Sequence, residues 1–249
     1  MKYEIKTVGK DAIQLTTYDE RWYLKTDEKT KTTLFVPSVT WIVSYYPKGI
    51  GFMKWLASKG WDEAESIKTD AGEKGSKIHQ AVEMLLNGEE IKHSHKFMKF
   101  GNYGEALEEE LTGEEYEAIY SFQKWYELFE PKIIKTEFPV FTEKYAGTVD
   151  FICEIKGEKY LIDLKTSQFV WPSHELQVSA YNHALGGKYK TAILQIGYAK
   201  NKAGYKFTEI ADKYDLFEAT YQIWENEVSK KQPLQKDLPL SLSLKIKKK

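Results

Sequence analysis

Two aspartates and one lysine in the middle of the chain, Asp150, Asp163 and Lys165, are of residue types that bind divalent metal ions and phosphate groups. Two carboxylates held close together repel each other, so a positive group is expected between them. Carboxylate oxygens suit Mg²⁺ or Mn²⁺, and such an ion can neutralise phosphodiester oxygens and activate a bound water. The ammonium group of Lys165 could then donate to that water or to the developing charge.

A β-hairpin must hold these residues if they are to act together. The sequence predicts strands at Ala146–Ile155 and Lys159–Lys165, joined by a turn at Lys156-Gly157. A two-residue loop places Asp150 directly opposite Asp163 in the antiparallel register. A four-residue loop keeps that register, whereas an odd-length loop would lose it.

The two faces of the hairpin differ in character. Lys165 is two residues beyond Asp163 and is therefore predicted to point to the same face. The opposite face is apolar throughout and is predicted to pack on a core: Val149, Phe151, Cys153, Tyr160, Ile162 and Leu164.

A helix upstream offers a histidine to the acid pair. The pattern predicts a helix from about Asp70 to Leu86, with a core stripe of Ile78, Val82 and Leu85. Gly75, His79 and Glu83 lie on one adjacent face. By itself His79 is typical of a surface or hydrogen-bonded helix histidine, but beside two acids it is a candidate metal ligand. Glycine is unfavourable inside a helix, so Gly75 predicts a close approach by another group.

Two further elements flank the hairpin. A strand at Ile133–Phe141 leads into it and carries Glu137, which we interpret as an acid behind the metal ligands or as an exposed strand residue. After the hairpin, Trp171-Pro172-Ser173 precedes a helix that continues to about Leu185, and on it Gln177 and Tyr181 share a face.

The rest of the N-terminal half predicts small elements. Residues 3–36 are typical of a β-meander of three strands, and Ser38 is a predicted N-cap for a helix at Val39–Tyr46. A short helix is expected at Phe52–Ser58. Residues 89–112 are weakly patterned and predict a loop or lid, in which His93 and His95 are more typical of solvated histidines than of zinc ligands.

A capping box, Thr112-x-x-Glu115, predicts a helix that ends at Glu130 before a proline. Its broad apolar stripe is expected to be mostly core: Tyr116, Ile119, Tyr120, Phe122, Tyr126 and Phe129. The C-terminal part predicts strands at Thr191–Tyr198 and Tyr205–Ile210, a helix at Asp215–Lys230, and an edge strand or disordered tail around 240–246.

The element order β-β-β-α-β around the hairpin predicts an α/β fold with a central mixed sheet flanked by helices. We expect one domain of 249 residues with four regions: the β-meander (1–36), a helical lobe with the His79 helix (37–130), the core sheet (131–211), and a C-terminal helix and tail (212–249).

The composition narrows the class of protein. With 249 residues and 42% hydrophobic content, the chain can bury one substantial core. No apolar run could cross a bilayer, and the N-terminus lacks the hydrophobic segment of a signal peptide, so we expect a cytoplasmic protein without membrane contact. Cys153 is the single cysteine, which excludes disulfides and iron–sulfur clusters held by four thiolates.

The charge distribution bears on contacts with nucleic acids. The net charge is −1, and Arg21 is the only arginine. Because lysine contacts phosphate as a point charge and arginine reads guanine, nucleic-acid contacts are expected with the backbone and not with particular bases. Each lysine cluster taken alone is more typical of a solvated surface.

The motifs together resemble a known family. Gly75-x-x-x-His79, Ala146–Asp150, Leu161–Thr166 and Gln177-x-x-x-Tyr181 occur in the order found in the PD-(D/E)xK nuclease superfamily, in the branch containing the nuclease domain of RecB. Pro37–Thr40 is similar to the opening segment of mitochondrial genome maintenance exonuclease and its phage and bacterial relatives. The resemblance covers about residues 37 to 200 and implies a restriction-endonuclease-like core.

The resemblance implies a role for each matched residue. His79, Asp150 and Asp163 would bind Mg²⁺ or Mn²⁺, with the backbone carbonyl of Leu164 as a further oxygen ligand. Lys165 would orient the attacking water or stabilise charge at the phosphate.

The supporting residues follow from the same resemblance. Gln177 and Tyr181 would hold the substrate or brace the site, and Glu83 would lie behind the ligands beside Gly75. The helix carries Lys74 where relatives often have arginine, which contacts phosphate. The iron–sulfur cysteines of CRISPR-associated and some helicase-linked relatives are missing, so no such cluster is expected.

The resulting hypothesis is a metal-dependent DNA exonuclease that acts on single-stranded or frayed ends without sequence specificity. Its setting would be DNA recombination, repair or replication, where a partner protein could join it. The alternatives are a structure-selective or restriction-type endonuclease, a DNA-binding module of the same fold without activity, and an α/β protein whose acids and lysine form a surface salt-bridge cluster.

Overall fold

A five-stranded mixed sheet forms the centre of the protein. The computed structural model describes residues 4–8, 12–17, 20–26, 33–100, 106–229 and 232–233. The strand order is β11-β10-β9-β8-β7, with bounds β7 Lys132–Phe141, β8 Ala146–Ile155, β9 Glu158–Lys165, β10 Lys190–Ile196 and β11 Tyr205–Ile210. Only β9 and β10 pair in parallel, because helix α5 (Pro172–Ala184) connects them. The predicted α/β class and β-β-β-α-β order are confirmed.

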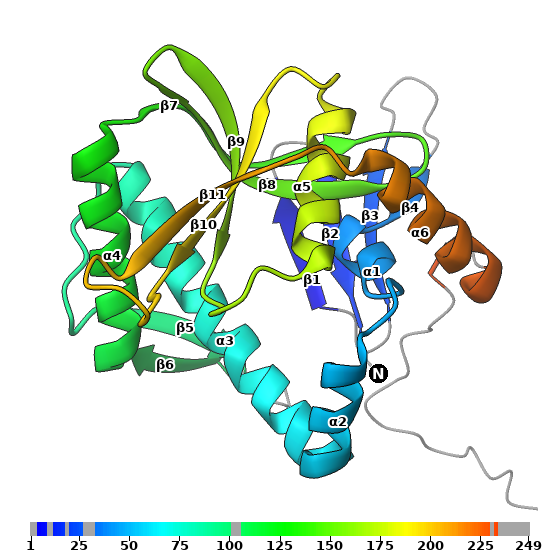
Figure 1. The fold of residues 1–249 in the computed structure, drawn as a ribbon, viewed down its shortest axis with the longest axis horizontal. Coiled ribbons are helices and arrows are strands. Elements are labelled where there is room, and N and C mark those ends of the chain that lie inside the picture. The colour runs from blue at the N-terminus through cyan, green and yellow to red at the C-terminus, as the bar shows by residue number, and fades with distance from the viewer. Residues whose placement is uncertain are drawn as a thin grey trace, which may run out of the picture.

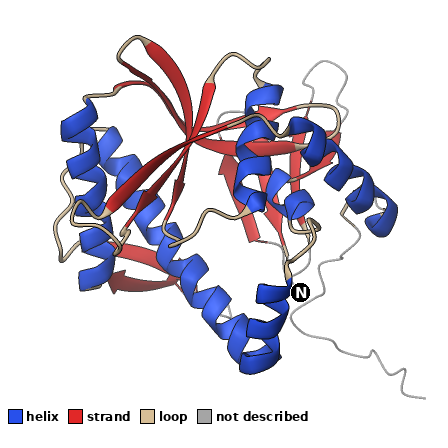
Figure 2. Cartoon of the chain, in the orientation of Figure 1, coloured by secondary structure: helices blue, strands red, loops and turns tan. Residues whose placement is uncertain are grey.

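Helices cover both faces of this sheet (Figure 1, Figure 2). Helices α3 (Trp61–Leu86) and α4 (Gly113–Phe129) pack on one face around Ile78, Trp125 and Leu164. Helices α1 (Val39–Val43), α5 and α6 (Tyr214–Val228) pack on the other around Leu161, Leu176 and Trp224. The sheet is therefore the middle layer of three, as its two apolar faces require.

The N-terminal residues form a second, antiparallel sheet of four strands. Its order is sequential, with β1 Glu4–Val8, β2 Ala12–Thr16, β3 Arg21–Thr26 and β4 Thr33–Pro37. The predicted meander is confirmed, but the sequence analysis counted three strands and missed β4. Val8, Tyr23 and Val36 pack with Ala146 of β8, so this sheet sits against the start of the central hairpin.

The hairpin has the predicted turn and register. Lys156 and Gly157 adopt positive φ of 51° and 84°, as a two-residue primed turn requires. Ile155 pairs with Glu158, and the ladder continues to the pair Phe151 and Ile162. The ladder ends there, one step before the pair of acids.

Two helices in the N-terminal lobe differ in extent from the prediction. Helix α3 begins at Trp61, and the predicted start at Asp70 is wrong. Gly60 precedes it with φ 75° and makes no side-chain cap, so no Ser, Thr, Asp or Asn marks the true start. Helix α1 is capped by Ser38 as predicted but ends at Val43, four residues before Pro47. Helix α2 (Ile50–Lys59) extends the predicted short helix.

Residues 89–112 are not a structureless loop. Strands β5 (Lys96–Phe100) and β6 (Ala106–Glu110) pair in this region. The side chain of Phe97 is buried, and an ion pair of 3.5 Å joins Lys96 to Glu108 across the strands. A two-stranded sheet held by charge pairs shows little alternation of apolar and polar residues. The sequence pattern therefore did not predict strands β5 and β6.

Helix α4 begins with the predicted capping box and ends at Phe129. The expectation that its aromatic stripe is mostly core is wrong for three tyrosines, which are exposed: Tyr116, Tyr120 and Tyr126. Trp125 is fully buried in their place. Tyrosine can keep its hydroxyl in water while its ring contacts apolar neighbours, so it is common at the boundary between the buried and exposed faces of a helix.

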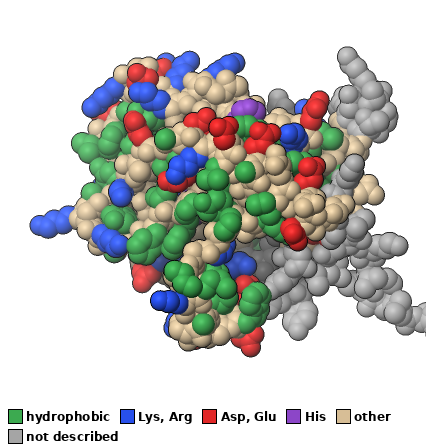
Figure 3. Space-filling view, turned by 45° about the vertical axis from the view of Figure 1, so that its right-hand side comes forward, with side chains coloured by type: hydrophobic (Ala, Val, Ile, Leu, Met, Phe, Trp, Pro, Cys, Tyr) green, Lys and Arg blue, Asp and Glu red, His purple; other side chains and the backbone are tan. Residues whose placement is uncertain are grey.

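The C-terminal elements agree with the prediction within a few residues, and the segment around 240–246 lies outside the described residues. On the face drawn in Figure 3, acidic and basic side chains are interspersed with apolar ones. Within the described residues, no helix is both long and apolar enough to cross a bilayer.

The hairpin turn gives a first test of how the acids are held. We expect Gly157→Ala to lower the free energy of unfolding by about 1 to 2 kcal/mol, because alanine is strained at positive φ. Gly113→Ala is the matched control, since a Cβ there meets no atom within 4 Å and φ is ordinary. Urea denaturation of both variants measures the difference, and equal stabilities would contradict the turn geometry.

Candidate functional site

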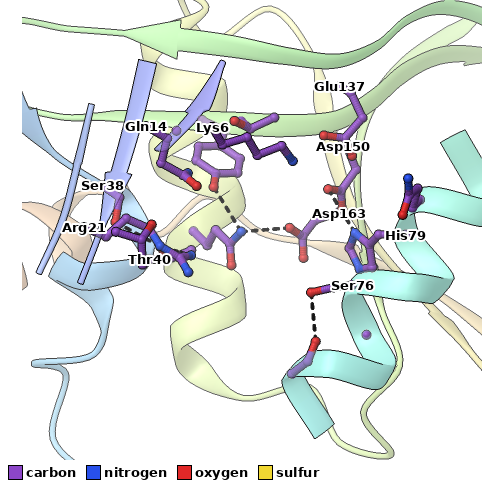
Figure 4. Close-up of a pocket in the computed structure, with 18 of the residues that line it drawn as sticks. Lys6, Gln14, Arg21, Ser38, Thr40, Ser76, His79, Glu137, Asp150 and Asp163 are labelled. Carbon is purple, nitrogen blue, oxygen red and sulfur yellow. Dashed lines mark hydrogen bonds and ion pairs between the residues drawn. The ribbon is translucent and has the colours of Figure 1, made fainter. Parts of the chain in front are cut away.

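A cavity of about 470 Å³ lies between helix α3, the N-terminal sheet and the start of the central hairpin. Its lining includes most of the residues that the sequence analysis singled out: Gly75, His79, Glu83, Asp150, Asp163, Lys165, Gln177 and Tyr181. Figure 4 shows it in close-up, with Asp150 and Asp163 between the strands of the N-terminal sheet and helix α3. The residues come from four separate elements, so only the folded chain brings them together.

Asp163 is buried and held at both carboxylate oxygens. Oδ2 lies 2.7 Å from the ammonium of Lys165, and Oδ1 accepts a hydrogen bond of 3.0 Å from Nε2 of Gln177. Lys165 also donates to Oε1 of Gln177 at 3.3 Å. The predicted placement of Lys165 beside the acid is confirmed, and Gln177 ties the two together.

Tyr181 lies behind this group as a brace. Nε2 of Gln177 contacts the Tyr181 hydroxyl at 3.1 Å. A Cβ built on Gly147 would lie 2.2 Å from Cε1 of Tyr181, so only glycine lets strand β8 approach this ring. Gly147 lies within the Ala146–Asp150 motif, for which no separate role of the glycine was predicted. A glycine inside a predicted strand was the signal that could have found it.

Asp150 connects the hairpin to helix α3. Its Oδ2 accepts a short hydrogen bond of 2.6 Å from the backbone N–H of Leu164, and its Oδ1 lies 3.4 Å from Nδ1 of His79. His79 is half-buried. The predicted meeting of the histidine helix and the hairpin is therefore observed, at Asp150.

Glu137 is the residue that the sequence analysis underestimated. Among the described residues, one group of possible metal ligands has donor atoms all within 4.8 Å of one another: His79, Glu137 and Asp150. Asp163 is not part of this group, and its oxygens contact Lys165 and Gln177. The predicted combination of His79, Asp150, Asp163 and the Leu164 carbonyl remains a prediction.

The backbone is irregular at Glu137, opposite Asp150. Glu137 has φ 40°, and the ladder between β7 and β8 skips Glu137 and Asp150 between two regular pairs. Val149 packs on the α5 side of the sheet, whereas Phe151 packs on the α3 side. The expectation of one continuous apolar face is therefore wrong at Val149, which packs on the other side of the sheet from Phe151.

Burial and mutual repulsion govern the charges of the acids. Burial, opposed by Lys165 and assisted by the nearby charge of Asp150, raises the pKa of Asp163 to about 6. Burial and the charge of Asp150 raise the pKa of Glu137 to about 7.

His79 and Asp150 stabilise each other's charged forms. Burial opposes ionisation of His79, but the charge and hydrogen bond of Asp150 outweigh it, so the pKa of the imidazole is raised. Burial likewise opposes ionisation of Asp150, yet His79, Lys165 and the Leu164 N–H together lower its pKa.

Two predicted positions, Gly75 and Lys74, have other surroundings than expected, and a third, Glu83, does not. A Cβ on Gly75 would lie 3.6 Å from Oγ1 of Thr166, which is ordinary contact, so the predicted close approach is wrong. Lys74 forms an ion pair of 2.6 Å with Glu114 of α4 and does not line the cavity. Glu83 does line it, and its charge contributes to the raised pKa of Glu137.

Comparison with known proteins adds little to this geometry. No protein-family model and no curated protein matches the chain. A solved structure described as "Crystal structure of SSO0001" is similar with 17% identity and a TM-score of 0.31. The match covers 45% of this chain and 56% of that one, so the chain spans about half the length of that protein. A likeness this weak carries no argument about function.

The raised pKa of Glu137 predicts a pH-dependent stability in the presence of a chelator. Its carboxylate is harder to ionise in the folded chain than in the unfolded chain, so the protein loses stability as pH rises from about 4.5, the ordinary pKa of a glutamate, to about 7. We expect Glu137→Gln to remove that loss and to be more stable than the parent by about 1 to 2 kcal/mol at pH 8. The difference should vanish near pH 4.

Thermal unfolding between pH 4 and 8 measures this effect. Glu143→Gln is the control, because Glu143 is exposed in the connection between β7 and β8. A Glu137→Gln variant with the same pH profile as the parent would show that the carboxylate is not buried against Asp150.

Proposed function

We propose that this protein is a divalent-metal-dependent DNA nuclease. The observation that carries the proposal is the convergence of His79, Glu137, Asp150, Asp163 and Lys165 on one cavity. Asp163 is buried, and burying a charged group costs free energy. A salt-bridge cluster on the surface would not require that cost, so the burial of Asp163 favours a functional site. The resemblance of the motif order to PD-(D/E)xK nucleases supports the same reading.

The donor atoms fit a hard divalent cation. His79, Glu137 and Asp150 offer one imidazole nitrogen and carboxylate oxygens within 4.8 Å of one another, a combination compatible with Mn²⁺ and tolerable for Mg²⁺. Such an ion, when bound, would neutralise phosphodiester oxygens and lower the pKa of a water. Asp150 belongs both to this set and to the set implied by the resemblance, in which Asp163 replaces Glu137.

Lys165 is fixed in position before any substrate binds. Its ammonium contacts Asp163 and Gln177 and remains partly exposed to the cavity. A cation held by two partners can donate to a phosphate oxygen or a water without further ordering. Gln177 and Asp163 thus act as positioning residues for Lys165.

The proposed substrate is a DNA strand without a required sequence. A single arginine in the chain leaves little capacity for bidentate reading of guanine. The named relatives favour an exonuclease that acts on single-stranded or frayed ends during recombination, repair or replication, and an endonuclease is the alternative. We also propose that a protein of the recombination, repair or replication machinery binds this nuclease.

End-labelled single-stranded and double-stranded oligonucleotides, incubated with Mg²⁺ or Mn²⁺, test the proposed activity. We expect cleavage that EDTA abolishes, and intact circular single-stranded DNA under the same conditions. Cleavage of the circle would favour the endonuclease, and no cleavage of any substrate would overturn the proposal.

Calorimetry with Mn²⁺ tests the donor set without requiring activity. We expect Asp150→Asn to weaken binding by about tenfold or more, because this carboxylate is common to both sets. Glu137→Gln and Asp163→Asn then show which acid completes the site. Glu154→Gln, further along β8 and outside the cavity, is the control. Parent-like affinity in Asp150→Asn would remove the metal site from this cavity.

Lys165→Gln tests the proposed role of the lysine. We expect kcat to fall by about 100-fold or more, because the positive charge at the phosphate is lost, while Mn²⁺ affinity changes little. Glutamine can still donate to Asp163, which limits the loss of stability. Lys159→Gln, exposed on the same strand, should cleave like the parent. Unchanged kcat in Lys165→Gln would exclude the lysine from the reaction.

A further inference from the structure

The side of the cavity opposite His79 carries the chain's only arginine. Arg21 belongs to β3, and Figure 4 shows it with Ser38 and Thr40 across the cavity from His79 and Asp163. Its Nη1 donates to Oγ1 of Thr40 at 3.4 Å. No residue of this wall belongs to the proposed metal and lysine site.

Within the part of the chain that the structure describes, no carboxylate forms an ion pair with Arg21. Its side chain is half-buried, and Thr40 takes only one of the five N–H groups of a guanidinium. By contrast, Lys77 of the nearby helix α3 is neutralised by Glu109 at 3.3 Å and Glu115 at 2.9 Å. A half-buried charge without a counter-ion is unfavourable, so Arg21 is suited to an anionic ligand.

The hydroxyl groups beside Arg21 form a short relay that can serve the same ligand. Oγ of Ser38 accepts from the backbone N–H of Trp41 at 3.0 Å and lies 3.0 Å from Oγ1 of Thr40. When Ser38 donates to Thr40, Thr40 accepts from both Ser38 and Arg21, and its own hydrogen remains for a ligand. This gives the Pro37–Thr40 motif a chemical role that the proposed metal site does not.

We propose that Arg21 and Thr40 bind a phosphate of the substrate strand next to the phosphate that is cleaved. The inference rests on the proposed function and deepens it. A guanidinium fork matches two phosphate oxygens, and every nucleotide of a strand carries a phosphate. A strand bound at the acids therefore brings further phosphates along the cavity, of which Arg21 contacts one.

The experiment combines a charge-removing variant with charge-removing substrates. Arg21→Gln and Arg21→Lys are compared with the parent on single-stranded oligonucleotides that carry one neutral methylphosphonate linkage, moved stepwise along the strand. Lys25→Gln, exposed on the same strand β3 and outside the cavity, is the matched control. The backbone carbonyl of Arg21 accepts from the N–H of Ser38 at 2.9 Å, a bond that does not depend on the side chain, and circular dichroism checks that both variants fold.

We expect Arg21→Gln to raise KM about tenfold with little change in kcat and no change in Mn²⁺ affinity. One methylphosphonate position should weaken the parent by a similar factor and have no further effect on Arg21→Gln. The dependence of log affinity on log salt should lose about 0.7 in slope, the value for one phosphate of a single strand. Arg21→Lys should recover part of the affinity, because it keeps the charge without the fork.

The outcomes separate this inference from the proposed function. If the parent cleaves but Arg21→Gln keeps the parent's KM and methylphosphonate profile, the inference is overturned and the nuclease proposal stands. If the parent binds a fluorescent oligonucleotide without cleaving it, the nuclease proposal fails. The effect of each methylphosphonate position on binding affinity, in the parent and in Arg21→Gln, then shows whether Arg21 contacts a phosphate. A parent that neither binds nor cleaves overturns both.

Discussion

The structure depends on holding negative charges close together where little water can reach them. Asp150 and Asp163 lie on neighbouring strands, and each carboxylate is stabilised by a different route. Asp163 has Lys165 and an amide N–H, whereas Asp150 has a backbone N–H and the imidazole of His79. Each partner comes from an element that must fold correctly before the acid can be tolerated. The site and the fold therefore constrain each other, and a third acid, Glu137, is accommodated largely through its raised pKa.

The parts of the site that sequence could predict are those fixed by local geometry. The hairpin register follows from a two-residue turn, and the shared face of Gln177 and Tyr181 follows from helical spacing. Both need only neighbours in the chain. The start of α3 could not be read, because Gly60 offers no side-chain cap and the helix continues through Gly72. The general α/β arrangement was predictable because strand and helix patterns alternate clearly around the hairpin.

The residues whose position in the site the sequence could not establish, Glu137 and Arg21, are brought there by tertiary packing. Glu137 is one acid among many on exposed strand positions, and its approach to His79 depends on how β7 twists and how α3 packs. Arg21 lies more than a hundred residues before the acids and reaches the cavity only because the N-terminal sheet packs on Ala146. The spacing of residues along the chain does not determine such long-range contacts. The composition therefore shows that Arg21 is the only arginine but not that it lies at the cavity.

The left-handed backbone at Glu137 lies across from the position where strand β8 departs from regular alternation. Side chains of a regular strand alternate between the two faces, so a single position can serve the α3 layer or the α5 layer but not both. Val149 packs on the α5 side and Phe151 on the α3 side, and Asp150 between them contacts His79 of α3 and the N–H of Leu164. His79 from one layer and Gln177 from the other can then share one cavity. A non-glycine residue in this conformation is strained by about 1 to 2 kcal/mol, and such strain is typical of positions where a binding site, and not stability, determines the backbone.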